Sequence, residues 1–125
     1  MIPTFLPLLE QKELSIANQS LRERYLGIGK YVEQFEKICA NKLSIKRERV
    51  VSVNTGFSAL HLSCMLLNIK RGDEVIMPSL TNVADAQVVI SLGAKIIFCD
   101  VLENTFCIDP DKLKKLISKK TKLII

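Results

Sequence analysis

The chain has 125 residues, of which 48% are hydrophobic, and a formal net charge of +5 at pH 7. This length allows one domain or part of one, and the apolar content is sufficient for a core, so a disordered chain is excluded. No apolar run reaches the roughly 18 residues needed to span a membrane. The first ten residues lack the basic start of a signal peptide. We therefore expect a cytoplasmic globular protein with no membrane partner.

The basic residues do not follow the pattern of a nucleic-acid-binding protein. They are spread among acidic residues, and the densest patches, at residues 46–49 and 112–122, contain no interleaved aromatic side chains. We interpret them as solvated surface. The four cysteines form no Cys-x-x-Cys pair, and there is one histidine, so no zinc framework is present. We expect no metal site and buried, reduced thiols.

Residues 1–48 are predicted to form an extended segment followed by two helices. Two prolines favour extended chain over residues 1–9. Apolar side chains at helical spacing predict helices at residues 11–24 and 31–43, with Glu36 among the polar residues on the other faces. A Gly-Ile-Gly-Lys sequence at residues 27–30 lies between them. It is a weak match to a phosphate-binding loop because no strand precedes it.

Residues 49–125 show the alternating pattern of an α/β domain. Four short apolar runs predict strands at residues 50–53, 74–77, 95–99 and 123–125. Helices are predicted at residues 58–67, at residues 83–92 before Gly93, and from Pro110 onward with Asp109 as the N-cap. Continuous apolar runs are typical of buried parallel strands. The expected fold is therefore α/β, with a mostly parallel sheet, flanking helices and an incomplete C-terminal strand.

The turn after the first predicted strand is the strongest candidate site. Asn54, Thr55 and Gly56 lead from that strand into a helix. A helix N-terminus carries unpaired backbone N–H groups and partial positive charge, which suit a phosphate. Gly56 would let the backbone approach such a group closely. On this stretch alone, a plain strand-to-helix connection that binds nothing remains the alternative.

Other polar residues follow the predicted strands, where ligands bind in open parallel sheets. Asp100 and Glu103 could form a carboxylate pair for acid–base chemistry, but solvated strand-end caps are favoured. Whether Asp85 has a functional or a structural role is left open, and His61 is interpreted as a packed, structural residue. One of the polar residues in the loop at 79–82 is expected to cap the helix that follows.

Six stretches of the chain together match a known family in order and spacing. They are Tyr-Leu-Gly-Ile-Gly-Lys-Tyr-Val-Glu-Gln-Phe-Glu at 25–36, Thr-Gly-Phe-Ser-Ala-Leu-His-Leu at 55–62, Gly-Asp-Glu-Val-Ile-Met-Pro-Ser-Leu-Thr at 72–81, Leu-Gly-Ala at 92–94, Phe-Cys-Asp-Val at 98–101 and Lys-Thr-Lys-Leu-Ile-Ile at 120–125. The chain thereby resembles the DegT/DnrJ-type aminotransferases, pyridoxal-phosphate-dependent enzymes that aminate keto groups on nucleotide-linked sugars. The resemblance implies the N-terminal portion of the fold type I aminotransferase large domain, truncated.

The resemblance also implies which residues bind the cofactor. Gly56, Phe57 and Ser58 occupy the turn whose backbone amides hold the cofactor phosphate. Phe57 replaces a hydroxyl residue, and a hydrogen bond to a charged group contributes roughly 1.5–3 kcal/mol. Asn82 replaces an aromatic residue that stacks on the cofactor ring, and aromatic stacking contributes about 0.5–1.5 kcal/mol. Either Asn82 packs its amide plane on the ring, or the cofactor is held poorly.

The resemblance places the Schiff-base lysine and the acid that binds the pyridinium nitrogen after Ile125, so no catalytic residue is assigned here. It implies pyridoxal 5′-phosphate as cofactor, a nucleotide-linked sugar and glutamate as substrates, and a homodimer. Residues 1–48 and 49–125 would be two parts of this fragment, which is expected to be inactive alone. The alternative is a non-catalytic α/β module that binds phosphate or pairs with an intact subunit. A generic dinucleotide-binding domain is weaker, because the turn has one glycine where that fingerprint needs three.

Overall fold

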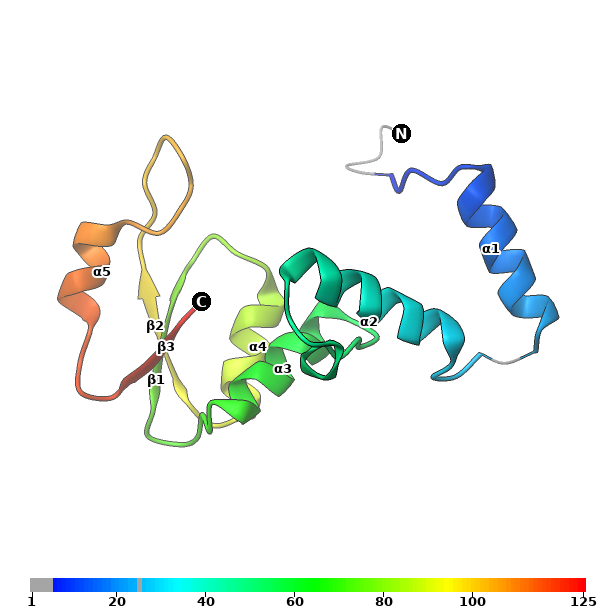
Figure 1. The fold of residues 1–125 in the computed structure, drawn as a ribbon. Coiled ribbons are helices and arrows are strands. Elements are labelled where there is room, and N and C mark those ends of the chain that lie inside the picture. Colours follow the sequence, from blue (N-terminus) through cyan, green and yellow to red (C-terminus); the bar gives the residue numbers. More distant parts are fainter. Residues whose placement is uncertain (1–5, 25) are drawn as a thin grey trace. The chain divides into compact units, whose positions relative to one another are not determined.

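A computed structural model describes residues 6–24 and 26–125 (Figure 1). Residues 1–5 of the predicted extended segment, and Tyr25 at the start of the first family motif, lie outside the described residues. The chain divides into two compact units, Met1–Ser52 and Val53–Ile125. Within the described part, no helix has both the length and the apolar character to cross a membrane.

The first unit contains two α-helices and a short 3₁₀-helix. α1 spans Gln11–Arg22, α2 spans Lys30–Leu43 and η1 spans Arg47–Arg49. Both predicted helices are confirmed. α1 starts with a capping box, in which the Glu13 side chain accepts a hydrogen bond from the Glu10 backbone N–H at 2.8 Å. None of the α1 side chains is buried.

A buried carboxylate ties α2 to the end of the first unit. Glu36 is 7% exposed, although the sequence pattern assigned it to a polar face. It accepts hydrogen bonds from the Ser52 backbone N–H at 3.0 Å and the Ser52 hydroxyl at 3.1 Å, and pairs with Arg47 at 2.7 Å. These bonds, led by the one from the Ser52 backbone, lower the pKa of Glu36 below its ordinary value.

We expect acid to destabilise the folded chain through Glu36. Because the pKa of Glu36 is lower in the folded state, its carboxylate adds stability that is fully present above the unfolded pKa of about 4.3. This stability is lost as the pH falls through the folded pKa. Urea denaturation between about pH 3 and 7 should therefore show a shallower pH dependence for Glu36→Gln than for the wild type. The exposed Glu33→Gln on the same helix is the control and should keep the wild-type slope. Equal slopes for all three proteins would contradict the prediction.

The second unit contains a three-stranded parallel sheet in the order β2-β1-β3. β1 spans Glu74–Pro78, β2 spans Lys95–Cys99 and β3 spans Thr121–Ile124. The central strand β1 pairs with β2 from Glu74 to Pro78 in continuous register, and with β3 through a register shift after Glu74. The predicted α/β fold with a parallel sheet is confirmed.

Three helices accompany this sheet: α3 at Gly56–Leu66, α4 at Val83–Ser91 and α5 at Pro110–Leu116. α3 and α4 pack with one face of the sheet in a single core cluster, whose buried members are Cys64, Ile69, Val75, Met77, Val88, Val89 and Ala94. Figure 1 shows α5 on the other side of the strands. Ile76 alternates with its two strand neighbours and points to that opposite face, where it is also fully buried. The central strand is therefore covered on both faces.

Local signals set two helix ends as predicted. Asp109 caps α5, because one carboxylate oxygen accepts hydrogen bonds from the Asp111 and Lys112 amides at 2.9 and 3.3 Å. Gly93 follows Leu92, the C-cap of α4, and has a φ of +73°, which is a left-handed conformation that favours glycine. Both ends depend on neighbouring residues alone.

The predicted strand at residues 50–53 is wrong. Val50 has an extended backbone, with φ −115° and ψ 125°, but these four residues pair with no strand in the described part of the chain. Val51 is 74% exposed. An apolar β-branched run becomes a strand only where a neighbour offers backbone partners, and the three paired strands all come later in the sequence.

The expectation of four buried cysteines is also wrong in part. All four thiols are free, but Cys107 is exposed and Cys39 is only half-buried. An antiparallel bridge between Val101 and Ile108 closes a loop that carries Cys107 outward. Cys64 and Cys99 are buried, and burial raises the pKa of both thiols.

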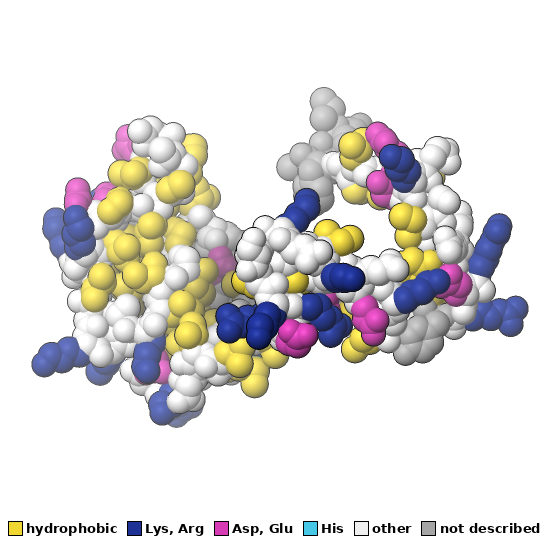
Figure 2. All heavy atoms as spheres, viewed as in Figure 1, with side chains coloured by type: hydrophobic (Ala, Val, Ile, Leu, Met, Phe, Trp, Pro, Cys, Tyr) yellow, Lys and Arg dark blue, Asp and Glu magenta, His cyan; other side chains and the backbone are white. Residues whose placement is uncertain are grey.

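Apolar side chains reach the surface of the second unit in several places. Figure 2 shows them gathered on the visible face of this unit, while basic side chains are scattered among acidic and apolar ones. Phe98, Phe106 and Ile117 are more than half exposed, at 58%, 64% and 54%. The scattered charge agrees with the interpretation of the basic residues as solvated surface.

Candidate functional site

Two helix N-termini lie at the carboxyl edge of the sheet in the second unit. α4 begins just after β1 ends, through the loop at 79–82, and α3 ends just before β1 begins, through the turn at 67–73. Both helices therefore run opposite to β1 and start at the same edge, which can be followed in Figure 1. This edge is where open parallel sheets bind ligands.

Side chains fix the first turn of α3. The Thr55 hydroxyl oxygen accepts a hydrogen bond from the Ser58 backbone N–H at 3.1 Å and so acts as the N-cap. The Ser58 hydroxyl donates to the Asn54 side-chain oxygen at 2.8 Å. Sequence reasoning did not identify the roles of Asn54 and Thr55. A threonine placed three residues before Ser58 at the start of an apolar run was the available signal.

Two backbone amides at this N-terminus have no hydrogen-bond partner among the described residues. They belong to Gly56 and Phe57, the first two residues of α3. The Ser58 amide is occupied by the Thr55 side chain, and the Ala59 amide donates to the Thr55 carbonyl oxygen at 3.2 Å. Of the three amides that the family resemblance assigns to a phosphate, two are therefore free and one is committed to the helix cap.

The space next to Gly56 is open. A Cβ atom built on Gly56 would meet no heavy atom within 4 Å, and its φ lies outside the left-handed region. Neither the backbone conformation nor internal packing therefore requires a glycine at this position. The space left beside the two free amides suits a group that must approach the backbone closely, as a phosphate does.

The aromatic side chains on this turn pack against each other. The Phe57 ring makes an edge contact with His61, with centroids 5.9 Å apart and planes at 65°. His61 is half-buried. The contact agrees with the interpretation of His61 as a packed residue.

The second helix N-terminus is capped by Asn82. Its side-chain oxygen accepts a hydrogen bond from the Ala84 backbone N–H at 2.9 Å. The capping residue expected in the loop at 79–82 is therefore Asn82. The Asn82 side chain remains exposed at the carboxyl edge of the sheet, with its oxygen committed to the cap. Nearby, the Thr81 hydroxyl donates to the buried Asp85 carboxylate.

An ion pair lies just after the end of β2. Asp100 pairs with Lys112 at 2.6 Å, and Asp109 lies 3.9 Å from the same ammonium group. The hydrogen bond between Asp100 and Lys112 lowers the pKa of Asp100 and raises that of Lys112. The structure thus pairs Asp100 with a lysine and not with Glu103. Lys112 is held protonated, which makes it a poor nucleophile.

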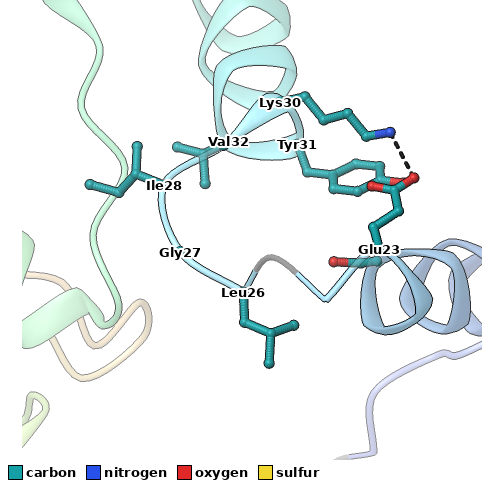
Figure 3. Close-up of a pocket in the computed structure, with 9 residues that line it drawn as sticks. Glu23, Leu26, Gly27, Ile28, Lys30, Tyr31 and Val32 are labelled. Carbon is teal, nitrogen blue, oxygen red and sulfur yellow. Dashed lines mark hydrogen bonds and ion pairs between the residues drawn. The ribbon is translucent and has the colours of Figure 1, made fainter.

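The first unit contains a separate hollow of about 630 Å³ around the loop between α1 and α2 (Figure 3). Its lining residues are Ser20, Glu23, Leu26, Gly27, Ile28, Gly29, Lys30, Tyr31 and Val32. Lys30 pairs with Glu23 at 2.7 Å, and the Tyr31 hydroxyl donates to the same carboxylate oxygen at 3.3 Å. The Lys30 charge is thus already neutralised, which gives no support to a phosphate-binding loop at residues 27–30.

The sequence model of the DegT/DnrJ/EryC1/StrS aminotransferase family matches residues 7–125. This chain belongs to that family. One similar relative is a protein from Saccharopolyspora spinosa named dTDP-4-dehydro-2,3,6-trideoxy-D-glucose 4-aminotransferase. It is 33% identical over 125 residues, which are 100% of this chain and 32% of the relative.

Solved structures that are similar to this chain agree with the fold. The aminotransferase TlmJ from Streptoalloteichus hindustanus matches with a TM-score of 0.91 and 34% identity, over 99% of this chain and 34% of that chain. NtdA from Bacillus subtilis, solved with bound cofactor PMP, matches with a TM-score of 0.79 and 34% identity, over 89% and 25% of the two chains. These neighbours confirm the predicted fold type I architecture. The chain spans about a third of the length of the curated relatives that it matches over its whole length.

The donor groups at the start of α3 fit the phosphate of the DegT/DnrJ family cofactor, pyridoxal 5′-phosphate. Gly56 and Phe57 provide two N–H donors, and the positive end of the α3 dipole favours a dianion. The open space beside Gly56 leaves room for its oxygens. This fit concerns the phosphate alone, because it rests on backbone N–H groups. The Phe57 side chain does not impair it, since any residue would provide the same N–H group.

Proposed function

We propose that this chain provides the cofactor-phosphate site of an aminotransferase that acts on nucleotide-linked keto sugars. The observation that carries the proposal is the pair of free amides, Gly56 and Phe57, beside open space at the N-terminus of α3. The name of the S. spinosa relative supports a nucleotide-linked keto sugar as substrate. The NtdA structure supports the cofactor, since PMP is the aminated form of pyridoxal 5′-phosphate.

In this proposal, the residues of this chain bind the cofactor phosphate and orient the cofactor. The Gly56 and Phe57 N–H groups donate to phosphate oxygens, and Thr55 holds the turn so that these donors need no reorganisation on binding. Asn82 lies at the start of α4, at the same edge of the sheet, with its side chain fixed by the Ala84 amide. When bound, the cofactor supplies the carbonyl carbon that carries the amino group between substrates.

The proposal includes glutamate as amino donor and a homodimer, in which the loop at 27–29 contributes to the neighbouring subunit's site. The proposal assigns no residue of this chain as the lysine that holds the cofactor or as the acid at its ring nitrogen. The proposal therefore assigns both to other parts of the enzyme. Four free cysteines suit a reducing compartment, which supports a cytoplasmic location.

A second candidate is a non-catalytic module that binds phosphate or pairs with an intact subunit. It is favoured by Asn82, which presents an amide with its oxygen already committed to the α4 cap, where an aromatic ring would stack better. Phe57 favours it as well, because its side chain adds no hydroxyl to the phosphate site.

Amide chemical shifts of the ¹⁵N-labelled chain can test both candidates. We expect inorganic phosphate and pyridoxal 5′-phosphate to shift the Gly56 and Phe57 signals in a saturable way, and pyridoxal without phosphate to leave them unchanged. An additional Asn82 shift with pyridoxal 5′-phosphate supports the cofactor site. Shifts limited to the Gly56 and Phe57 amides favour the second candidate. No shift with either phosphate compound would refute the phosphate site.

A further inference from the structure

The second unit buries a carboxylate on a helix face that is otherwise apolar. Asp85 is 8% exposed and lies three and four residues before the fully buried Val88 and Val89, on the sheet-facing side of α4. No lysine or arginine pairs with Asp85 in the part of the chain that the structure describes. Burying a charge costs free energy that an apolar side chain would avoid, so packing does not explain this residue.

Asp85 interacts with the loop that precedes α4. Its carboxylate accepts the hydrogen bond donated by the Thr81 hydroxyl, and its backbone N–H donates to the Asn82 carbonyl oxygen at 3.1 Å. The Asn82 side chain in turn accepts from the Ala84 N–H. The position of Asp85 in the first turn of α4 adds a favourable interaction with the helix dipole. Hydrogen bonds therefore hold both Thr81 and Asn82 to the first turn of α4.

We propose that Asp85 is a positioning residue for the candidate site. Through the Thr81 hydroxyl it fixes the loop at 79–82 at the carboxyl end of β1, and so holds Asn82 in place for the part of a ligand that extends beyond its phosphate. The inference rests on the proposed function, in which the N-terminus of α3 binds the phosphate of a larger ligand. An apolar residue in place of Asp85 would pack well but would leave the Thr81 hydroxyl without this acceptor.

Binding measurements with two ligands can distinguish the positioning role of Asp85 from phosphate binding itself. Inorganic phosphate needs only the Gly56 and Phe57 amides, whereas pyridoxal 5′-phosphate also carries a ring that reaches past them. A loop that is no longer held should therefore weaken binding of pyridoxal 5′-phosphate and spare that of inorganic phosphate. A residue that only supports the fold would affect both ligands together.

The test uses the whole chain and three threonine variants. Thr81→Val keeps the shape but removes the donor, Thr81→Ser keeps the donor, and Thr105→Val makes the same change in another exposed loop. We expect Thr81→Val to weaken pyridoxal 5′-phosphate binding by about tenfold, as for loss of a hydrogen bond to a charged group, with little change for inorganic phosphate. Thr81→Ser and Thr105→Val should bind both ligands as the wild type does. Asp85→Asn, a weaker acceptor, should fall between the wild type and Thr81→Val.

Three outcomes would overturn the inference. Thr81→Val with unchanged affinity for pyridoxal 5′-phosphate removes the positioning role and leaves the proposed function intact. An equal loss for both ligands, together with a lower melting temperature, shows a purely structural role. A wild-type chain that binds neither ligand overturns the proposed function, and the inference fails with it.

Discussion

Gly56→Ala should weaken phosphate binding by roughly tenfold or more without destabilising the chain. The new methyl group would stand in the open space beside the Gly56 and Phe57 amides, where phosphate oxygens must come within hydrogen-bond distance. It would meet no protein atom within 4 Å, and the backbone conformation is open to alanine. Restricting the unfolded chain should even add about 0.4–1 kcal/mol of stability. Calorimetric titration with inorganic phosphate and thermal unfolding measure the two effects separately.

A matched control uses the other end of the same helix. Leu66 is 87% exposed at the last position of α3, so Leu66→Ala should change neither phosphate affinity nor stability by much. Loss of affinity combined with retained or increased stability is the signature of a ligand site at Gly56. If Gly56→Ala bound phosphate as tightly as the wild type, the free amides would have no role in anion binding.

Ile76→Ala should have the largest effect on stability, about 2–5 kcal/mol. Ile76 is fully buried in the middle of the central strand β1, on the face of the sheet opposite to α3 and α4. Truncation removes apolar contacts and leaves a cavity that the paired strands on both sides cannot close. Since domains of this size are stable by only about 5–15 kcal/mol, this substitution removes a large part of the total.

The urea midpoint, followed by circular dichroism, measures this loss. Ile90→Ala provides the control because Ile90 is 64% exposed on α4, and its truncation should cost less than about 0.5 kcal/mol. Equal midpoints for the two variants would mean that the sheet does not form the core of the folded chain. A changed slope in the Ile76 variant would instead point to partial unfolding before the main transition.

The sequence predicted free amides at the start of α3, whereas the phosphate that they would bind stays a prediction. A glycine at the start of an apolar helix indicated free amides, and the family motifs indicated a phosphate. The sequence did not show that Thr55 takes the Ser58 amide and leaves only Gly56 and Phe57 available. The distribution of these donors depends on side-chain geometry within the turn, which residue types alone do not specify.

The sequence by itself determined the elements whose causes are local. Asp109 with Pro110 starts α5 and Gly93 ends α4, because caps and left-handed turns depend on a few adjacent residues. Only the tertiary structure decided the rest. The run at residues 50–53 forms no strand because strand pairing needs a partner distant in sequence. Glu36 is buried because Ser52 and Arg47 fold back onto it, and Asp85 is buried because its face of α4 packs against the sheet. No periodic pattern reveals where such partners will lie.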